Sequence, residues 1–73
     1  MDNILNNNIS YLNIDNNIID ICNNNDIFKI KDLWNLKRKD LKNINLSDKD
    51  INKITIELQL LGLDLNNKIY NKL

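Results

Sequence analysis

The sequence has no proline and no histidine, and it has only one glycine and one cysteine in 73 residues. The lack of histidine excludes the usual zinc ligand sets and a cysteine–histidine catalytic pair. The single Cys22 cannot form an internal disulfide. A single glycine excludes a glycine-rich phosphate-binding loop. We therefore expect no metal, no cofactor, no small-molecule substrate and no catalysis by this chain alone.

An excess of one charge is also missing, because ten basic residues balance ten acidic ones. A dedicated nucleic-acid-binding protein usually carries a basic excess, since phosphate contacts dominate its affinity. Any binding of DNA must therefore come from a local patch of the surface.

Long hydrophobic runs are absent as well. No apolar run approaches the roughly 20 residues that span a bilayer, and no basic segment followed by an apolar one marks a signal peptide. We expect no membrane partner and a reducing, cytoplasmic compartment, either bacterial or the matrix of an organelle. The 17 asparagines and 13 isoleucines, together with lysine, suggest an AT-rich genome.

The hydrophobic residues that are present, 42% of the chain, fall at helical spacings in one small domain. Asp15 is the predicted N-cap of a helix over residues 16–24, which the asparagines at 23–25 end, since asparagine tolerates a left-handed C-cap. Residues 29–35 read as helix or as an alternating strand. The absence of glycine and proline turns favours helix. Residues 38–43 form another short helix.

The last helix has the clearest signals. Ser47 is its predicted N-cap, and Asp50 three residues later resembles a capping box. A helical stripe follows at Ile51, Ile54, Leu58 and Leu61. Gly62 lies where a helix C-cap favours a left-handed residue.

These signals predict an all-α fold, a compact bundle of four to five short helices over residues 9–65. We expect residues 1–8 to be a flexible N-terminus. Residues 66–73 are predicted to be a polar tail, with Ile69, Tyr70 and Leu73 as anchors.

Three segments then show a resemblance to a known family: ISYLNIDNNIIDIC, NDIFKIKDLWNL and KDLKNINLSDKDINKITIELQLLGLDL. The chain from Ile9 to Leu65 resembles the C-terminal domain of the bacterial RNA polymerase alpha subunit. The apolar positions of the two match one by one, with one residue missing before Asn45. The resemblance implies a helical domain with a helix-hairpin-helix-like element. It also implies binding to AT-rich upstream promoter DNA, contacts with transcription factors or other polymerase subunits, and no catalysis.

The DNA-contact positions of that family fall on Asn17, Asp20, Ser47, Lys49, Asp50 and Lys53, and our candidate DNA-binding residues among them are Asn17, Ser47, Lys49 and Lys53. Only Lys49 keeps the family's residue. Asn17 replaces an arginine, the residue that narrow minor grooves attract, and Asp20 and Asp50 add negative charge. Two hypotheses follow. The chain is a non-catalytic transcription module that docks on upstream promoter DNA and/or a transcription regulator, or it is a protein–protein adaptor that keeps the fold and has lost DNA binding.

The turn before the last helix has two interpretations. Ser47 and the N–H groups of Asp48 and Lys49 could cradle a phosphate at a helix N-terminus. Alternatively, the helix is simply capped, with Asp48 and Asp50 complementing its dipole and repelling phosphate. The charges favour the capped helix.

The segment KIKDLWNLKRKDLK holds six basic residues and is the strongest basic patch. Our candidates for partner binding are Trp34, Lys37, Arg38 and Lys39. Their partner would be either phosphate groups or an acidic protein. The alternative is a solvated helical face with Trp34 in the core. Cys22 is expected to be a buried structural thiol.

Overall fold

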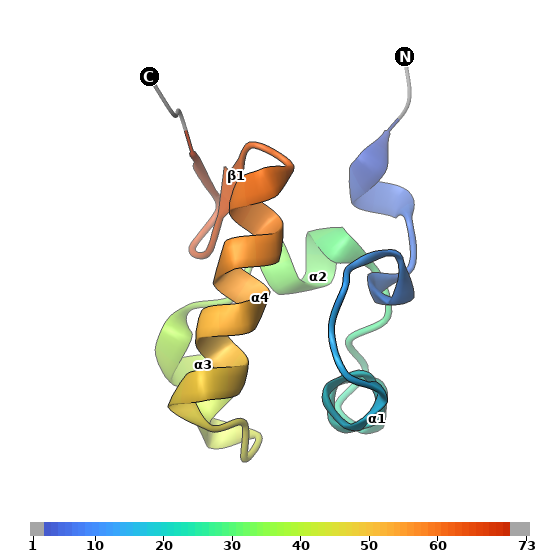
Figure 1. The fold of residues 1–73 in the computed structure, drawn as a ribbon, viewed down its shortest axis with the longest axis vertical. Helices are drawn as coiled ribbons and strands as arrows, with labels where there is room; N and C mark the ends of the chain where they lie inside the picture. Colours follow the sequence, from blue (N-terminus) through green and yellow to red (C-terminus); the bar gives the residue numbers. More distant parts are fainter. Residues whose placement is uncertain (1–2, 71–73) are drawn as a thin grey trace.

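The computed structural model describes residues 3–70, so Leu73, one of the predicted anchors, lies outside the described part. The chain is mostly helical and compact, and one small antiparallel hairpin follows its last helix (Figure 1). The elements in order are η1 (Ile4–Asn6), η2 (Ile9–Tyr11), α1 (Asn16–Asn24), α2 (Ile30–Trp34), α3 (Arg38–Asn43), α4 (Asp48–Leu60), β1 (Leu63–Asp64) and β2 (Lys68–Ile69). The hairpin, in which Leu63 pairs with Ile69, is an addition to the predicted all-α class.

The predicted helices over residues 16–24 and 38–43 agree with the bounds of α1 and α3, and α2 confirms helix over strand. The end of α1 needs a correction. Asn25 is the C-cap at φ −114°, and the left-handed residue is the next one, Asp26, at φ 62°. The Asn25 side chain donates instead to the carbonyl of Ile21, at 2.8 Å, which closes the last turn.

The start of each helix shows which cap predictions hold. Asp15 is the N-cap of α1, but its side chain makes no capping hydrogen bond. Ser47 Oγ accepts from the Asp50 N–H at 3.1 Å, as expected, whereas Asp50 does not return a bond to the Ser47 N–H. Carboxylates reach back to the N-cap N–H at α2 and α3 instead: Asp32 to Lys29 at 3.0 Å and Asp40 to Lys37 at 2.8 Å.

The α4 helix ends as predicted at Gly62, whose φ of 82° is left-handed. Its N–H donates to the Gln59 carbonyl at 2.9 Å. Glycine accepts this conformation because it has no Cβ to clash with the following carbonyl. The chain then turns back along the helix end and enters the hairpin.

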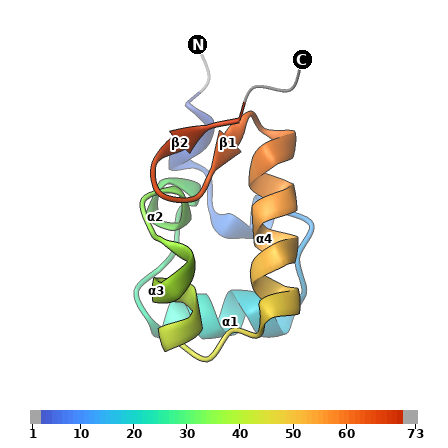
Figure 2. The ribbon, with the colours of Figure 1, turned by 90° about the vertical axis from the view of Figure 1, so that its left-hand side faces the viewer.

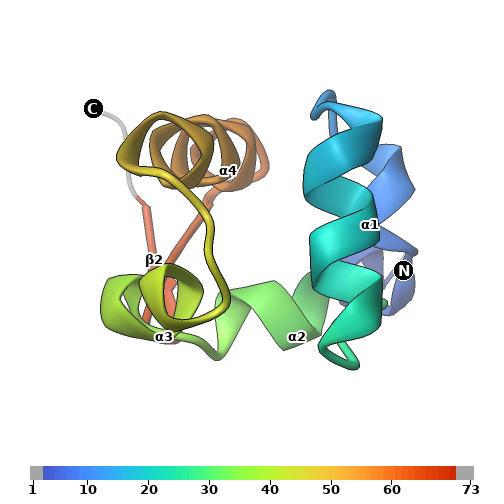
Figure 3. The ribbon, with the colours of Figure 1, turned by 90° about the horizontal axis from the view of Figure 1, so that it is seen from below.

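The core lies between α1, α2 and α4, with α3 and the hairpin closing one side (Figures 2 and 3). Its fully buried side chains come from η2 and from all four α-helices, and Leu63 and Leu65 extend it into the hairpin. The buried hydrophobic residues are Ile9, Leu12, Ile18, Cys22, Ile27, Ile30, Leu33, Leu41, Leu46, Ile51, Ile54, Leu58, Leu63 and Leu65. The single thiol is therefore a core group, as predicted.

The N-terminal segment is attached to the core within the described residues. The Ile9 N–H donates to the Phe28 carbonyl and the Ile30 N–H donates to the Asn7 carbonyl, both at 2.9 Å. Ile4 and Leu5 pack on the core as half-buried side chains. Contacts with the core therefore begin before residue 9, at which the sequence predicts the domain to start.

The predicted polar tail is likewise folded as far as Tyr70. The amides of Asn66 and Asn67 donate to the carbonyls of Leu36 and Trp34, both at 2.8 Å. Both asparagines have left-handed backbones, at φ 67° and 60°. Asparagine tolerates that conformation, so a polar segment forms the tight turn of the hairpin, and its backbone amides donate to the end of α2 and to the segment that follows α2.

Candidate functional site

The four candidate DNA-binding residues, Asn17, Ser47, Lys49 and Lys53, lie at the starts of α1 and α4. Lys49 and Lys53 line one groove of about 570 Å³ between these helices. The groove, called here the α1–α4 groove, is lined by Asp15, Ile18, Lys49, Asp50, Asn52, Lys53 and Ile56. Asn17 and Ser47 are exposed but do not line this groove. The structure thus brings two of the four residues into one groove and leaves two beside it.

Charges in the α1–α4 groove are balanced, because Lys49 and Lys53 face Asp15 and Asp50. Lys53 is also paired with Glu57, at 3.5 Å between Nζ and Oε2. The other oxygen of Glu57 accepts from the Asn13 N–H at 3.0 Å, so this carboxylate joins α4 to the segment before α1. The groove therefore offers little net attraction to a polyanion.

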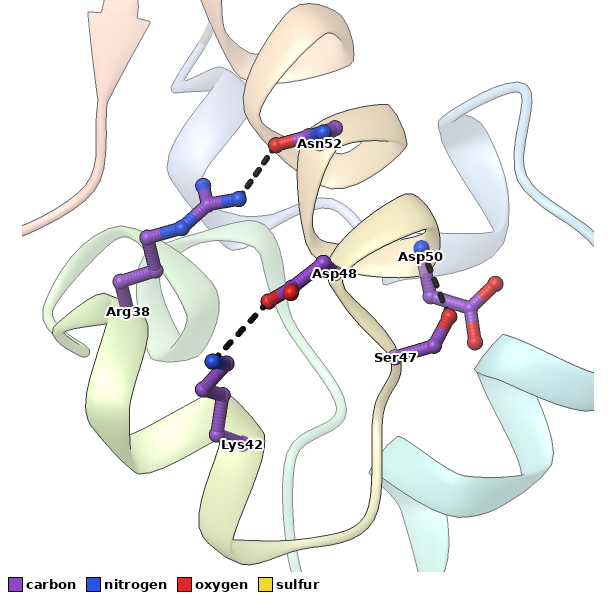
Figure 4. A network of polar contacts seen from close by, with 6 residues as sticks. All are labelled: Arg38, Lys42, Ser47, Asp48, Asp50 and Asn52. Atoms are coloured by element: carbon purple, nitrogen blue, oxygen red, sulfur yellow. Dashed lines mark hydrogen bonds and ion pairs between the residues drawn. The ribbon is translucent and has the colours of Figure 1, made fainter.

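The turn before α4 does not present a free cradle for phosphate. The Ser47 hydroxyl is occupied by the Asp50 N–H, and the carboxylate of Asp50 lies on the side of α4 that faces α1 (Figure 4). Asp48 and Asp50 both lie in the first turn of the helix, where they complement its dipole. The geometry agrees with the capped-helix interpretation.

Apolar surface continues from the α1–α4 groove along α4. Ile18 is buried in the groove, whereas Ile56 is 51% exposed at its wall. Leu60, one turn further along α4, is 72% exposed. Residues at i and i+4 lie on one helix face, so Ile56 and Leu60 form an apolar stripe that leads out of the groove.

A second groove, of about 490 Å³, lies between α3 and the hairpin. It is called here the basic groove and is lined by Lys37, Arg38, Lys39, Thr55, Asp64, Leu65, Asn66 and Lys68. The structure therefore brings three of our four partner-binding candidates together. Lys68 was missed, because no sequence signal connected the expected tail to the patch.

Two basic side chains of the patch tie α3 to α4 (Figure 4). Arg38 donates through Nη2 to Oδ1 of Asn52, and Lys42 Nζ lies 3.1 Å from Oδ1 of Asp48. An exposed ion pair of this kind contributes little stability, but it does partner the ammonium group of Lys42 with a carboxylate. Lys37, Lys39 and Lys68 form no ion pair with any residue between 3 and 70.

Trp34, the fourth partner-binding candidate, lies under the hairpin. Its indole N–H donates to the Lys68 carbonyl at 2.7 Å, and the ring packs against the core as a half-buried side chain. The residue therefore connects α2 to β2. This placement agrees with the core interpretation of Trp34.

Burial raises the pKa of the Cys22 thiol from 9.0 to about 11. The group is thus protonated at neutral pH, and it is fully enclosed. Within residues 3–70, no three or more acidic or cysteine side chains gather where they could hold a metal ion. In the same part of the chain, no helix has the length and apolar character needed to cross a membrane.

Comparison with known proteins gives no family. No protein-family model matches the chain, and no curated protein matches it.

Proposed function

We propose that this chain is a non-catalytic transcription module that docks on a transcription regulator through the α1–α4 groove. The observation that carries the proposal is that α4 and the start of α1 line one groove, with Ile18 at its base and Ile56 exposed. In the family that the sequence resembles, these two helix starts form the docking face. The helix order α1 to α4, with α3 and α4 as the helix-hairpin-helix-like element, supports the same proposal.

A polypeptide fits this groove better than DNA does. Protein interfaces combine an apolar centre with a polar rim, and the groove has Ile56 beside Lys49 and Asp50. The balanced charges would give DNA no net attraction, whereas a protein partner can meet both signs. The regulator would thus place an apolar side chain between α1 and α4.

Site-specific photocrosslinking in the cells that naturally express the chain tests this proposal. A crosslinking side chain at Ile56 should capture transcription regulators or polymerase subunits, identified by mass spectrometry. The matched control is the same side chain at Asn24, an exposed position at the other end of α1. Capture of the same proteins from both positions, or of no transcription protein from Ile56, would overturn the proposal.

Promoter DNA at the same groove is the second candidate, because Lys49 lines the groove and retains the family's residue. Lys49→Ala separates the two candidates. If DNA binds here, its affinity falls and the dependence of log K on log salt becomes shallower by about one unit. If the groove takes a regulator, DNA titration leaves the amide NMR signals of Asn17 and of residues 47–53 unmoved.

A further inference from the structure

The charged residues of the chain are distributed unevenly over its surface. Residues 13–28, which include α1, carry three aspartates and no basic residue. The basic groove carries four basic residues against one acidic residue, Asp64. The two regions lie on opposite sides of the molecule, with α1 on one side and α3 with β2 on the other (Figure 3). A neutral chain thus has one distinctly positive face.

The cations of the basic groove come from two elements that the fold brings together. Lys37, Arg38 and Lys39 lie at the start of α3, and Lys68 begins β2 on the opposite wall. The hydrogen bond from the Trp34 indole to the Lys68 carbonyl holds that wall against α2. An extended anion lying in the groove would therefore meet lysines on both sides.

The composition of the groove suits phosphate better than protein. Lysine is depleted in protein interfaces, which rely on aromatic and apolar anchors. Leu65, the apolar side chain of this lining, is 7% exposed, and Trp34 is held under the hairpin. Lysine and asparagine side chains, which make up most of the exposed lining, are common phosphate contacts.

We propose that the basic groove binds the phosphate backbone of double-stranded DNA. Single strands are a poorer fit, because their binding sites use exposed aromatic rings on which bases stack, and no aromatic side chain lines this groove. Contacts of this kind hold the chain on a duplex without reading its sequence. The proposal concerns a different surface and a different partner from the α1–α4 groove.

Salt dependence of duplex binding tests this proposal. The test variant is Lys39→Gln with Lys68→Gln, one lysine from each wall. The matched control is Lys29→Gln with Lys31→Gln, which removes the same charge from two exposed lysines outside the groove. Fluorescence anisotropy with a labelled duplex would be measured from low to moderate salt. Each phosphate contact contributes about 0.9 to the slope of log K against log salt, so the test variant should lose about 1.8 and the control none.

Three results would overturn the proposal: equal slopes for both variants, tighter binding to a single strand of the same length, or equal binding of polyglutamate. Amide NMR signals of Lys39, Asn66 and Lys68 in the unmodified chain should also shift with duplex DNA, which keeps the test valid if a variant folds poorly. The outcome is independent of the crosslinking at Ile56, so each proposal can fail alone.

Discussion

At the scale of single residues, Asp32 connects the first turn of α2 to two backbone N–H groups that directly precede the helix. Its Oδ2 accepts from the N–H groups of Phe28 and Lys29, at 3.1 and 3.0 Å. The hydrogen bond from the Lys29 N–H, and to a smaller extent the one from Phe28, lower the pKa of Asp32 below its ordinary value of 3.8. The carboxylate thereby stabilises the start of α2.

Replacing this carboxylate should destabilise the protein by an amount that depends on pH. Asp32→Ala is expected to lower the free energy of unfolding by about 1 kcal/mol at neutral pH, as for other lost N-terminal caps. Because the folded pKa is lowered, the stabilisation is fully present above 3.8 and is lost as pH falls through the folded value. Urea denaturation followed by circular dichroism at pH 7 and at several values below 3.8 would measure it.

The control for this experiment is Asp20→Ala, an exposed carboxylate in α1 that accepts none of the hydrogen bonds between residues 3 and 70. Its replacement should change stability by no more than about 0.5 kcal/mol at any pH. A constant difference between wild type and Asp32→Ala across the whole pH range would contradict the assigned role.

Cap residues show what the sequence can and cannot predict at this scale. Ser47 and Gly62 have standard cap chemistry and were predicted correctly. The caps at α2 and α3 were missed, because lysine occupies both N-cap positions and the acceptor comes from the third helical residue. Left-handed asparagines at 45, 66 and 67 were not anticipated, since asparagine is common throughout this chain.

At the scale of elements, the hairpin depends on α2. Two residues per strand are too few for a stable isolated hairpin. Hydrogen bonds from Asn66, Asn67 and the Trp34 indole supply the missing support. This explains why periodicity predicted the helices but missed the hairpin, whose determinants are distant in sequence.

Removing the indole N–H should loosen the hairpin selectively. Trp34→Phe keeps a large aromatic ring on the core but loses the donor to Lys68, at a cost of about 1 kcal/mol. Hydrogen exchange measured by NMR should speed up at the Asn66 and Asn67 amides more than in α4. Phe28→Leu, at an exposed aromatic position away from the hairpin, serves as the control. Uniform acceleration in both variants would argue against a local role for Trp34.

At the scale of the whole molecule, one small core holds all the elements. Leu41→Ala removes the fully buried side chain by which α3 joins the core. This change should lower the free energy of unfolding by about 3 kcal/mol. The total free energy of unfolding of a small domain is only about 5–15 kcal/mol, so this loss should appear as a large drop in the urea midpoint. Leu60→Ala, at a 72% exposed position, should change the midpoint little. Similar losses for the two variants would contradict the assigned core.

The candidate sites also depend on this scale. The sequence identified Lys37, Arg38 and Lys39 as a patch, but only the folded chain places Lys68 opposite them. The sequence also identified Lys49 and Lys53 as candidate DNA-binding residues. The charge balance of their groove depends in part on Asp15, the N-cap of a different helix, α1. Local patterns predict which residues share an element. They do not predict which elements share a groove.

The arrangement of the ends has a practical consequence. The elements η1 and β2 lie together at one end of the molecule, while the starts of α1 and α4 lie at the opposite end (Figures 1 and 2). A fluorophore, an affinity handle or a surface anchor joined beyond either η1 or β2 would therefore sit at the far pole from the α1–α4 groove. Attachment at this end would leave the starts of α1 and α4 clear of the support, which suits the chain to capture experiments.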